Sequence, residues 1–251
     1  MQLQKRHLII ALGIYLIALV ATIPAHFFTG LINRNLPGVT VSGLEGSIWS
    51  GRIDQLYLSQ TSLQGVAWHL QPLALLLGRL QVELEYADRQ NHIEVALARG
   101  FTGSTHLRGI QGQVDVAWLQ GLTPYPIPVF KGVLQFEDVR LRLDGQIPED
   151  ASGSLQWRGA AVDIGQTITL GQLMMQLRTA GDGIEAVVTE TSGRLDGDAR
   201  VSVTADGRYR INAKLTPTDK GAELSRHLAL VMRRNPDGSF VYSYQGRLPS
   251  R

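Results

Sequence analysis

Residues 79–97 read RLQVELEYADRQNHIEVAL, and this stretch decides the fold. Apolar and polar residues alternate through residues 79–86 and again through residues 92–97, with a short polar segment between the two runs. Successive side chains of a strand point to opposite faces of a sheet, so this alternation predicts two strands with one apolar and one polar face each.

The same period of two recurs along most of the chain. Further runs of this kind occupy residues 39–42, 52–58, 133–136, 139–143, 153–157, 168–170, 173–177, 184–188, 199–203, 209–215 and 240–245. About a dozen short strands separated by glycine-bearing turns indicate an antiparallel, meandering sheet. We therefore predict a mainly β fold: a single N-terminal transmembrane helix followed by a large curved antiparallel β-sheet domain with one or two short helices.

The predicted membrane helix rests on residues 8–25, which read LIIALGIYLIALVATIPA and carry no charge. At 1.5 Å per residue, this length crosses most of a ~30 Å hydrocarbon core. A cleaved signal peptide is the competing interpretation, but its apolar core is shorter and ends in small residues, whereas His26 and Phe27 follow here. We favour an uncleaved anchor.

Positive charge near this segment sets the expected topology. Lys5 and Arg6 precede it, and the first basic residue after it is Arg34. The positive-inside rule then keeps the N-terminus in the cytoplasm. The expected plan is a cytoplasmic N-terminus (1–7), a transmembrane helix (8–26), a juxtamembrane linker (27–38) and a β-rich domain (39–251), which is periplasmic in a Gram-negative cell.

Three segments interrupt the strand pattern. Residues 27–36 suit a short helix that ends at Pro37 and Gly38. Residues 71–78 suit another, because Pro72 fits a first helical turn and Gly78 fits a helix end. Residues 218–234 suit a third, with apolar side chains at helical spacing and two arginines at its end, namely Leu224, Leu228, Val231, Met232, Arg233 and Arg234.

Composition excludes several classes of function. The chain has 24 Lys and Arg against 22 Asp and Glu, and without Lys5 and Arg6 the two numbers are equal. This balance gives no sign of a nucleic-acid partner. The absence of cysteine excludes disulfides, thiol catalysis, thiolate metal sites and an acylated lipoprotein cysteine.

Catalytic patterns find little support, and we expect no enzyme activity, metal or cofactor. The six histidines are scattered, no serine lies in a Gly-x-Ser-x-Gly elbow, and no phosphate-binding glycine loop is present. His92 and Glu94 share a strand face but form a weak metal pair. Glu83 and Glu85 also share a face, which we interpret as solvated.

Two motifs stand out, GLEGSIWSGR at residues 43–52 and LQGVAWHLQPLALLLGRL at residues 63–80. A third segment, residues 153–159, contains Trp157. With the N-terminal span, they resemble protein N of the type II secretion system, the general secretory pathway of Gram-negative bacteria. The resemblance covers nearly the full chain, and its motif positions are Gly46, Trp49, Gly51, Trp68, Pro72, Gly78 and Trp157.

The motifs also look like those of AsmA-type envelope proteins, which handle lipids in a β-groove and are commonly longer. Without any family, the motif residues suit core and turn roles. Gly46 and Gly51 permit tight turns around Trp49. Trp68 and Pro72 fix a strand-to-helix corner, with residues 75–77 packed beneath it. A groove lining or a docking patch is the alternative for these positions.

The resemblance implies a non-enzymatic inner-membrane component that contacts other inner-membrane or periplasmic secretion subunits and assists the export of folded proteins. The alternative is a lipid-binding or lipid-transfer module, since an apolar sheet face needs cover that an acyl chain can supply. Whether the helices at 71–78 and 218–234 cover this face would separate the two hypotheses. Edge strands, residues 218–234 and residues 124–128 are all credible docking surfaces.

Overall fold

The computed structural model describes residues 7, 22–35, 38–58, 61–100, 103–121, 129–145, 147–163, 167–192, 195–218, 225–226, 228–229 and 232–247. Within them, 14 strands form one sheet whose order follows the chain from β1 to β12, after which β14 and then β13 complete it. Every neighbouring pair is antiparallel. The predicted antiparallel meander is confirmed.

The strands are β1 (Val39–Gly46), β2 (Ser50–Leu58), β3 (Thr61–Leu70), β4 (Arg79–Ala87), β5 (His92–Gly100), β6 (Thr105–Asp115), β7 (Val129–Asp144), β8 (Ile147–Asp163), β9 (Thr167–Ala180), β10 (Gly183–Ser192), β11 (Leu195–Thr204), β12 (Arg208–Pro217), β13 (Arg233–Arg234) and β14 (Phe240–Arg247). The helices are η1 (Ala25–Phe28), α2 (Thr29–Asn35), α3 (Pro72–Leu76) and α4 (Val116–Gly121). The short helix expected over 27–36 corresponds to η1 and α2.

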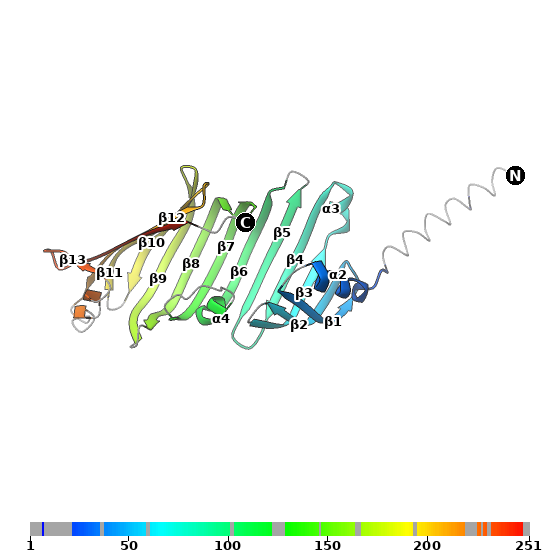
Figure 1. Cartoon of the computed structure of the whole chain (residues 1–251), viewed down its shortest axis with the longest axis horizontal. Coiled ribbons are helices and arrows are strands. Elements are labelled where there is room, and N and C mark those ends of the chain that lie inside the picture. The colour runs from blue at the N-terminus through cyan, green and yellow to red at the C-terminus, as the bar shows by residue number, and fades with distance from the viewer. Residues whose placement is uncertain are drawn as a thin grey trace.

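Figure 1 shows the strands side by side in a long single layer, with β1 at one end and β13 at the other. The strand direction rotates along the layer, so that β4 to β9 run steeply in this view and the last strands run almost across it. Such rotation is the normal twist of a sheet. Over the residues that the structure describes, the domain is therefore one open sheet without a second sheet packed on it.

One face of the sheet carries the apolar side chains in three clusters. Their buried members are Leu63, Val66 and Tyr86 in the first, Ile110, Val139 and Leu155 in the second, and Ile168, Leu228 and Phe240 in the third. Ile93 packs against both the first and the second cluster, which makes them continuous. Most of their other members are only partly buried, because a single layer leaves this face with little cover.

Glycines at positive φ shift the alternation of the first strands. The unbroken register of β1, β2 and β3 aligns Gly43, Asp54 and Gly65, and the two glycines have φ of 66° and 74°. On the two sides of this row, the residues that face the apolar side differ between odd and even positions. Leu63 and Val66, three residues apart, therefore belong to one cluster. A simple period of two therefore fails across this row.

The same effect explains why no run of period two marked β3 and β6, although a strand leading into the corner at Trp68 was expected. In β6 the pairing register shifts between Leu107 and Ile110 and again between Ile110 and Gly112. Gly109 and Gly112, at φ of 58° and 122°, provide these irregularities. Bulges of this kind insert extra residues into a strand and interrupt its alternation.

Helix α4, which the sequence did not predict, lies against the apolar face. Trp118 stacks on Tyr86 with ring centroids 5.3 Å apart. Asp115 directly precedes the helix, and its Oδ1 accepts the N–H of Ala117 over 2.7 Å. Asn91 Oδ1 in turn accepts the Asp115 N–H over 2.7 Å. The turn between β4 and β5 thereby fixes where α4 starts.

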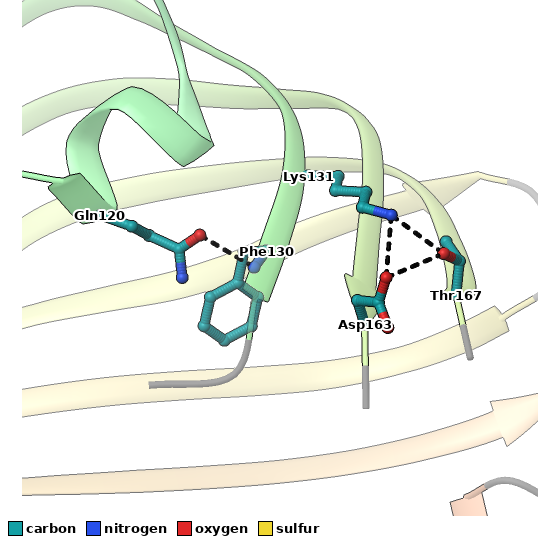
Figure 2. A network of polar contacts seen from close by, with 5 residues as sticks. All are labelled: Gln120, Phe130, Lys131, Asp163 and Thr167. Atoms are coloured by element: carbon teal, nitrogen blue, oxygen red, sulfur yellow. Dashed lines mark hydrogen bonds and ion pairs between the residues drawn. The ribbon is translucent and has the colours of Figure 1, made fainter. Parts of the chain in front are cut away.

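The far end of α4 is fastened to β7, as Figure 2 shows. Gln120 Oε1 accepts the N–H of Phe130 over 3.0 Å. The next residue, Lys131, reaches from β7 to the ends of β8 and β9, where its Nζ lies 2.9 Å from Asp163 Oδ2 and 3.1 Å from Thr167 Oγ1. These contacts join three strand ends at one margin of the sheet.

The helix predicted over residues 218–234 is wrong at its C-terminal end. Arg233 and Arg234 form β13 and pair with β14 instead of ending a helix. The helical spacing holds between Leu228 and Met232, because the Met232 N–H donates to Leu228 O over 2.8 Å and both side chains join the cluster of Ile168 and Phe240. Helical residues are described at 225–226 and 228–229, while Leu224 and Val231 lie outside the described residues.

Two further predictions also fall largely outside the described residues. Only residues 22–26 of the predicted membrane helix over 8–26 are described, and the loop at residues 124–128 is not described at all. In the described part of the chain, no helix has both the length and the apolar character needed to cross a membrane.

Candidate functional site

The first motif forms the tight turn between β1 and β2. Gly46 lies opposite Gly51 at φ of 95°, and a Cβ on Gly46 would lie 2.5 Å from the carbonyl oxygen of Ser50. Ser47 donates its N–H to Ser50 O over 2.9 Å, and its Oγ accepts the N–H of Trp49 over 3.2 Å. The predicted role of Gly46 as a turn glycine therefore has a direct geometric basis.

Gly51 also serves the tight turn, although its φ is not positive: a Cβ on it would collide with the carbonyl oxygen of Glu45 on β1. It lies opposite Trp68 of β3, and a Cβ at this position would collide with the indole ring. The indole Nε1 donates to the carbonyl oxygen of Ile48 over 3.3 Å, and the N–H of Leu70 donates to Trp49 O over 2.6 Å. Trp68 thus lies across the strand that carries the first motif.

The second motif turns the chain through α3 as the sequence predicts. Gln71 is the N-cap residue with its N–H bonded to Gln81 O over 3.0 Å, and Pro72 opens the helix. Gly78 has φ of 71°, and its N–H donates to Leu75 O over 2.9 Å. Six of the seven predicted motif positions therefore meet in one corner of the sheet, built from β1, β2, β3 and α3.

The prediction that residues 75–77 pack beneath this corner is wrong. Leu73 is 74 % exposed, Leu76 83 % and Leu77 77 %, and α3 has no buried residue. Figure 1 shows α3 at the margin of the sheet, beyond the strand ends, so that no strand lies beneath it. The result is an exposed leucine patch, and large exposed apolar patches usually mark contacts with another surface.

An apolar hollow lies beside the same corner. Its volume is about 440 Å³, and its lining consists of Ala25, Leu44, Ile48, Ile53, Val66, Trp68, Leu70, Val82 and Leu84. Ala25 comes from η1 and is buried. Pro24 forms a bridge with Ser47, and Ile48 donates its N–H to Ile23 O over 3.0 Å. Residues 23–25, the C-terminal end of the predicted membrane span, are therefore packed and bonded against the first motif.

Trp157, the seventh motif position, lies elsewhere but repeats the arrangement of Trp68. It belongs to β8, and its Nε1 donates to Lys131 O on β7 over 3.1 Å. A glycine on the neighbouring strand again leaves room for the ring, since a Cβ on Gly132 would lie 2.9 Å from the indole nitrogen. Phe130 packs edge-on against Trp157 at 5.7 Å. Both tryptophans thus lock adjacent strands together.

The opposite, polar face gathers carboxylates over β4 and β5. Glu83, Glu85 and Glu94 line a shallow hollow of about 460 Å³ together with His69 and Arg108. Two of these acids bind glutamines: Gln71 Nε2 donates to Glu83 over 2.8 Å, and Gln111 Nε2 donates to Glu94 over 2.7 Å. This hydrogen bonding agrees with the predicted solvated face.

His92 Nε2 lies 3.2 Å from Glu94 Oε1, so the predicted shared face of this pair is correct. Within the described residues, however, no three His, Asp or Glu side chains are grouped so that they could hold a metal ion.

Further along this face lies the buried carboxylate Glu185. Its side chain is only 10 % exposed, and it accepts Arg178 Nη2 and Arg200 Nε, each over 2.7 Å. Two arginines from the neighbouring strands thus compensate one desolvated charge. This is a structural ion triad that joins β9, β10 and β11.

Tyr86 and Asp88, two ionisable side chains with shifted pKa values, lie at the turn between β4 and β5. Burial and the hydrogen bond to Asp88 raise the pKa of Tyr86 to about 12. Burial raises the pKa of Asp88, but hydrogen bonds from Tyr86, Asn91 and the Gln90 backbone outweigh it and hold this pKa at about 2. The 2.6 Å bond between Tyr86 Oη and Asp88 Oδ2 contributes to both shifts. This pair serves the turn that positions α4.

Comparison with known proteins agrees with the fold and motifs. The family model "Type II secretion system (T2SS), protein N" matches residues 37–243. The chain belongs to this family. Its match includes both motifs, the whole strand order from β1 to β13 and part of β14. It thereby confirms the resemblance found in the sequence.

Curated relatives carry the same name. The chain is 26 % identical over 253 residues to the type II secretion system protein N of Aeromonas hydrophila, covering 96 % of each chain. It is 25 % identical over 225 residues to that of Vibrio cholerae, covering 84 % of this chain and 86 % of the relative. It is 24 % identical to that of Pectobacterium carotovorum. No solved structure matches. The chain is accordingly a component of a type II secretion system.

Several structurally important residues were not found from the sequence. Asn33, Asp88 and Asn91 act through contacts with residues 3 to 24 positions away, and no local pattern marks them. The run of leucines in α3 was visible, but its exposure was not.

Proposed function

We propose that this family member is a non-enzymatic, single-pass inner-membrane component of the type II secretion apparatus. In this proposal its β-rich domain lies in the periplasm, contacts other inner-membrane or periplasmic subunits, and assists the export of folded proteins across the outer membrane. The observation that carries the proposal is the open sheet of this chain, bonded at its first motif to residues 23 and 24, which lie at the end of an uncharged apolar run.

The exposed leucine patch of α3 supports a position close to the membrane. The hydrogen bonds that Ile48 N–H donates to Ile23 O and Leu70 N–H donates to Trp49 O connect the end of the apolar run to the start of α3 across two strand ends. Leu73, Leu76 and Leu77 therefore project from the same corner at which the anchor would enter the domain. Apolar side chains at such a corner suit the membrane surface or a neighbouring subunit.

Topology can be tested cleanly because the natural chain has no cysteine. A single cysteine at Ser202, in the β-rich domain, should react in intact cells with a maleimide that crosses only the outer membrane. A cysteine at Gln4 should react only after the inner membrane is opened. The reverse pattern would refute the proposed orientation, and labelling of both sites in intact cells would refute the anchor.

The role in secretion is tested by deleting the gene and measuring where an exported enzyme accumulates. Deletion should retain the folded enzyme in the periplasm and remove it from the medium. Complementation should restore secretion with the natural chain but not with a chain whose residues 1–26 are replaced by a cleavable signal peptide. Undiminished secretion by the deletion strain would refute the role.

A second candidate function, binding of a lipid acyl chain, is favoured by the apolar hollow beside the first motif. Among the described residues, the helices expected to cover the apolar face cover little of it: α3 projects away, and Leu228 covers only the last cluster. A hollow of about 440 Å³ lined by apolar side chains lies within the size range of small-molecule sites.

Photoactivatable phosphatidylethanolamine in vesicles tests this candidate. Leu44→Trp would fill the hollow, whereas Glu45→Trp places the same side chain on the other face of β1. If an acyl chain occupies the hollow, only Leu44→Trp should reduce crosslinking. Equal crosslinking of both variants would refute lipid binding at this hollow without affecting the proposed secretion role.

A further inference from the structure

The two edge strands of the sheet differ in how their outer backbone groups are hydrogen-bonded. At the first edge, the side chain of Asn33 from α2 bonds to the outer backbone of β1. Its Oδ1 accepts the Val41 N–H over 2.8 Å, and its Nδ2 donates to Val41 O over 3.4 Å. At the other edge, among the described residues, only Arg233 and Arg234 pair with the outer side of β14, opposite Val241 and Phe240 respectively. The remainder of β14, residues 242–247, presents its outer side unpaired within the described chain.

The direction of the backbone groups on this outer side follows from the neighbouring turn. Ser239 O accepts the Asn235 N–H over 2.8 Å, so the carbonyl of Ser239 points toward β13. Backbone groups of alternate residues in an antiparallel strand point to the same side. Ser243, Gln245 and Arg247 therefore direct their N–H and C=O groups outward. A free row of this kind is a template for a further strand.

The side chains along this edge differ on the two faces. On the apolar face, Tyr242 and Tyr244 are 38 % and 49 % exposed, with their rings stacked at 6.5 Å. On the polar face, Arg247 lines a hollow of about 600 Å³ together with Arg208 and Arg210. An incoming strand would meet aromatic rings on one face and guanidinium groups on the other.

We propose that the outer edge of β14 docks an extended segment of a partner protein in which apolar and acidic residues alternate. Main-chain hydrogen bonds to Ser243, Gln245 and Arg247 add it to the sheet as a further strand. Its apolar side chains lie over Tyr242 and Tyr244, and its carboxylates face the arginines. This inference rests on the proposed function, because it assigns one surface through which the component contacts another subunit.

Charge excludes a second copy of this chain as the preferred occupant. β14 contains no Asp or Glu, so pairing it with another β14 would bring the Arg247 side chains of both copies onto an interface without a carboxylate. The β1 edge of a second copy carries the Asn33 contact, which already occupies the backbone groups of Val41. Arg208 already pairs with Asp206 over 2.5 Å, but among the described residues no carboxylate forms an ion pair with Arg210 or Arg247, and an acidic partner would supply one.

A labelled peptide of sequence EVEVEVEV, titrated against the purified full chain in detergent micelles, tests the docking edge by fluorescence anisotropy. The peptide KVKVKVKV controls for charge, and an EVEVEVEV peptide N-methylated at alternate residues controls for main-chain pairing. Ser243→Pro removes one outward N–H at an edge position that tolerates proline, and Ser243→Ala is its matched control. Tryptophan fluorescence confirms that each variant is folded.

EVEVEVEV should bind, and both control peptides should bind at least about tenfold more weakly, which equals about 1.4 kcal/mol. Ser243→Pro should weaken binding by a similar factor and Ser243→Ala should not. Bound peptide should also slow amide exchange at residues 243, 245 and 247. No binding of EVEVEVEV at millimolar peptide, equal binding of KVKVKVKV, or equal binding by Ser243→Pro would each overturn the proposal.

Together with the deletion experiment, these outcomes test the docking edge of β14 separately from the proposed role in secretion. Peptide binding by a chain whose deletion leaves secretion intact would refute the secretion role and keep the docking edge. A deletion that stops secretion, in a chain that does not bind the peptide, would refute the edge alone.

Discussion

Replacing Asn91 by aspartate should place two carboxylates against each other at the junction that holds α4. Asn91 is 4 % exposed; its Nδ2 donates to Asp88 Oδ2 over 2.8 Å and its Oδ1 accepts the Asp115 N–H over 2.7 Å. Aspartate preserves the volume and the acceptor for Asp115. It removes the donor to Asp88 and adds a second negative charge there.

The expected cost follows from these contacts. A hydrogen bond to a charged group contributes about 1.5–3 kcal/mol, and repulsion between the carboxylates adds to its loss. We expect Asn91→Asp to lower the free energy of unfolding by about 2–4 kcal/mol at pH 7. Asn91→Ala should cost a similar amount, because it loses the hydrogen bonds to both Asp88 and Asp115.

The pH dependence separates the two variants. In the natural chain the folded pKa of Asp88 is about 2, below its unfolded value of 3.8, so its contribution is present above about pH 4 and is lost as the pH falls toward 2. A shift of this size corresponds to about 2 kcal/mol, which the solvent exposure of Asp88 reduces to about 1 kcal/mol. In Asn91→Asp the two facing carboxylates share a proton, which raises the pKa of the pair. The stability of this variant relative to the natural chain should therefore rise as the pH falls.

Urea unfolding of the full chain in detergent micelles at pH 7, 5 and 4, followed by circular dichroism, measures these differences. Relative to the natural chain, Asn91→Asp should regain stability as the pH falls from 7 to 4, whereas Asn91→Ala should keep a nearly constant deficit from pH 7 to 5. An Asn91→Asp deficit that is independent of pH, or that grows with acid, would refute the contact between the two carboxylates.

Three further predictions use the same unfolding assay. Trp68→Phe and Trp157→Phe should each cost about 1 kcal/mol, because each loses one indole hydrogen bond to a carbonyl; no loss in either would contradict the strand-locking role. Replacing Leu76 and Leu77 together by serine should change stability by less than about 0.5 kcal/mol, since both are exposed, and a larger loss would mean that α3 is covered. Phe240→Ala should cost about 3–5 kcal/mol, because Phe240 is fully buried against Ile168 and Leu228; a cost below 1 kcal/mol would contradict this core.

The strands were predictable wherever the period of two is unbroken. β4 and β5 alternate without interruption, and the sequence located both. No run of period two marked β3 and β6, because Gly65, Gly109 and Gly112 shift the alternation inside the strand. Helix α4 is too short to show a helical pattern of apolar residues in the sequence. Tertiary contacts through Asn91 and Gln120 position it.

The candidate corner was predictable in membership but not in geometry. Gly46, Trp49, Gly51, Trp68, Pro72 and Gly78 stand in two short motifs, so their proximity followed from strand pairing. Three features could not be inferred from the motifs: that Gly51 exists to admit the ring of Trp68, that α3 projects its leucines away from the sheet, and that Asn33 protects the first edge. Each depends on residues that are distant in the sequence.

The sequence by itself determined the class of this protein: a meander of strands with one apolar face, no thiol chemistry, and a charge balance without a nucleic-acid signal. These properties are local or additive, and alternation or composition reports them directly. Only the tertiary structure decided which apolar side chains are covered, how Glu185 is neutralised, and which edge of the described sheet keeps an unpaired backbone. Burial, charge pairing and edge exposure depend on strand register and on what packs against each residue, and no single segment contains that information.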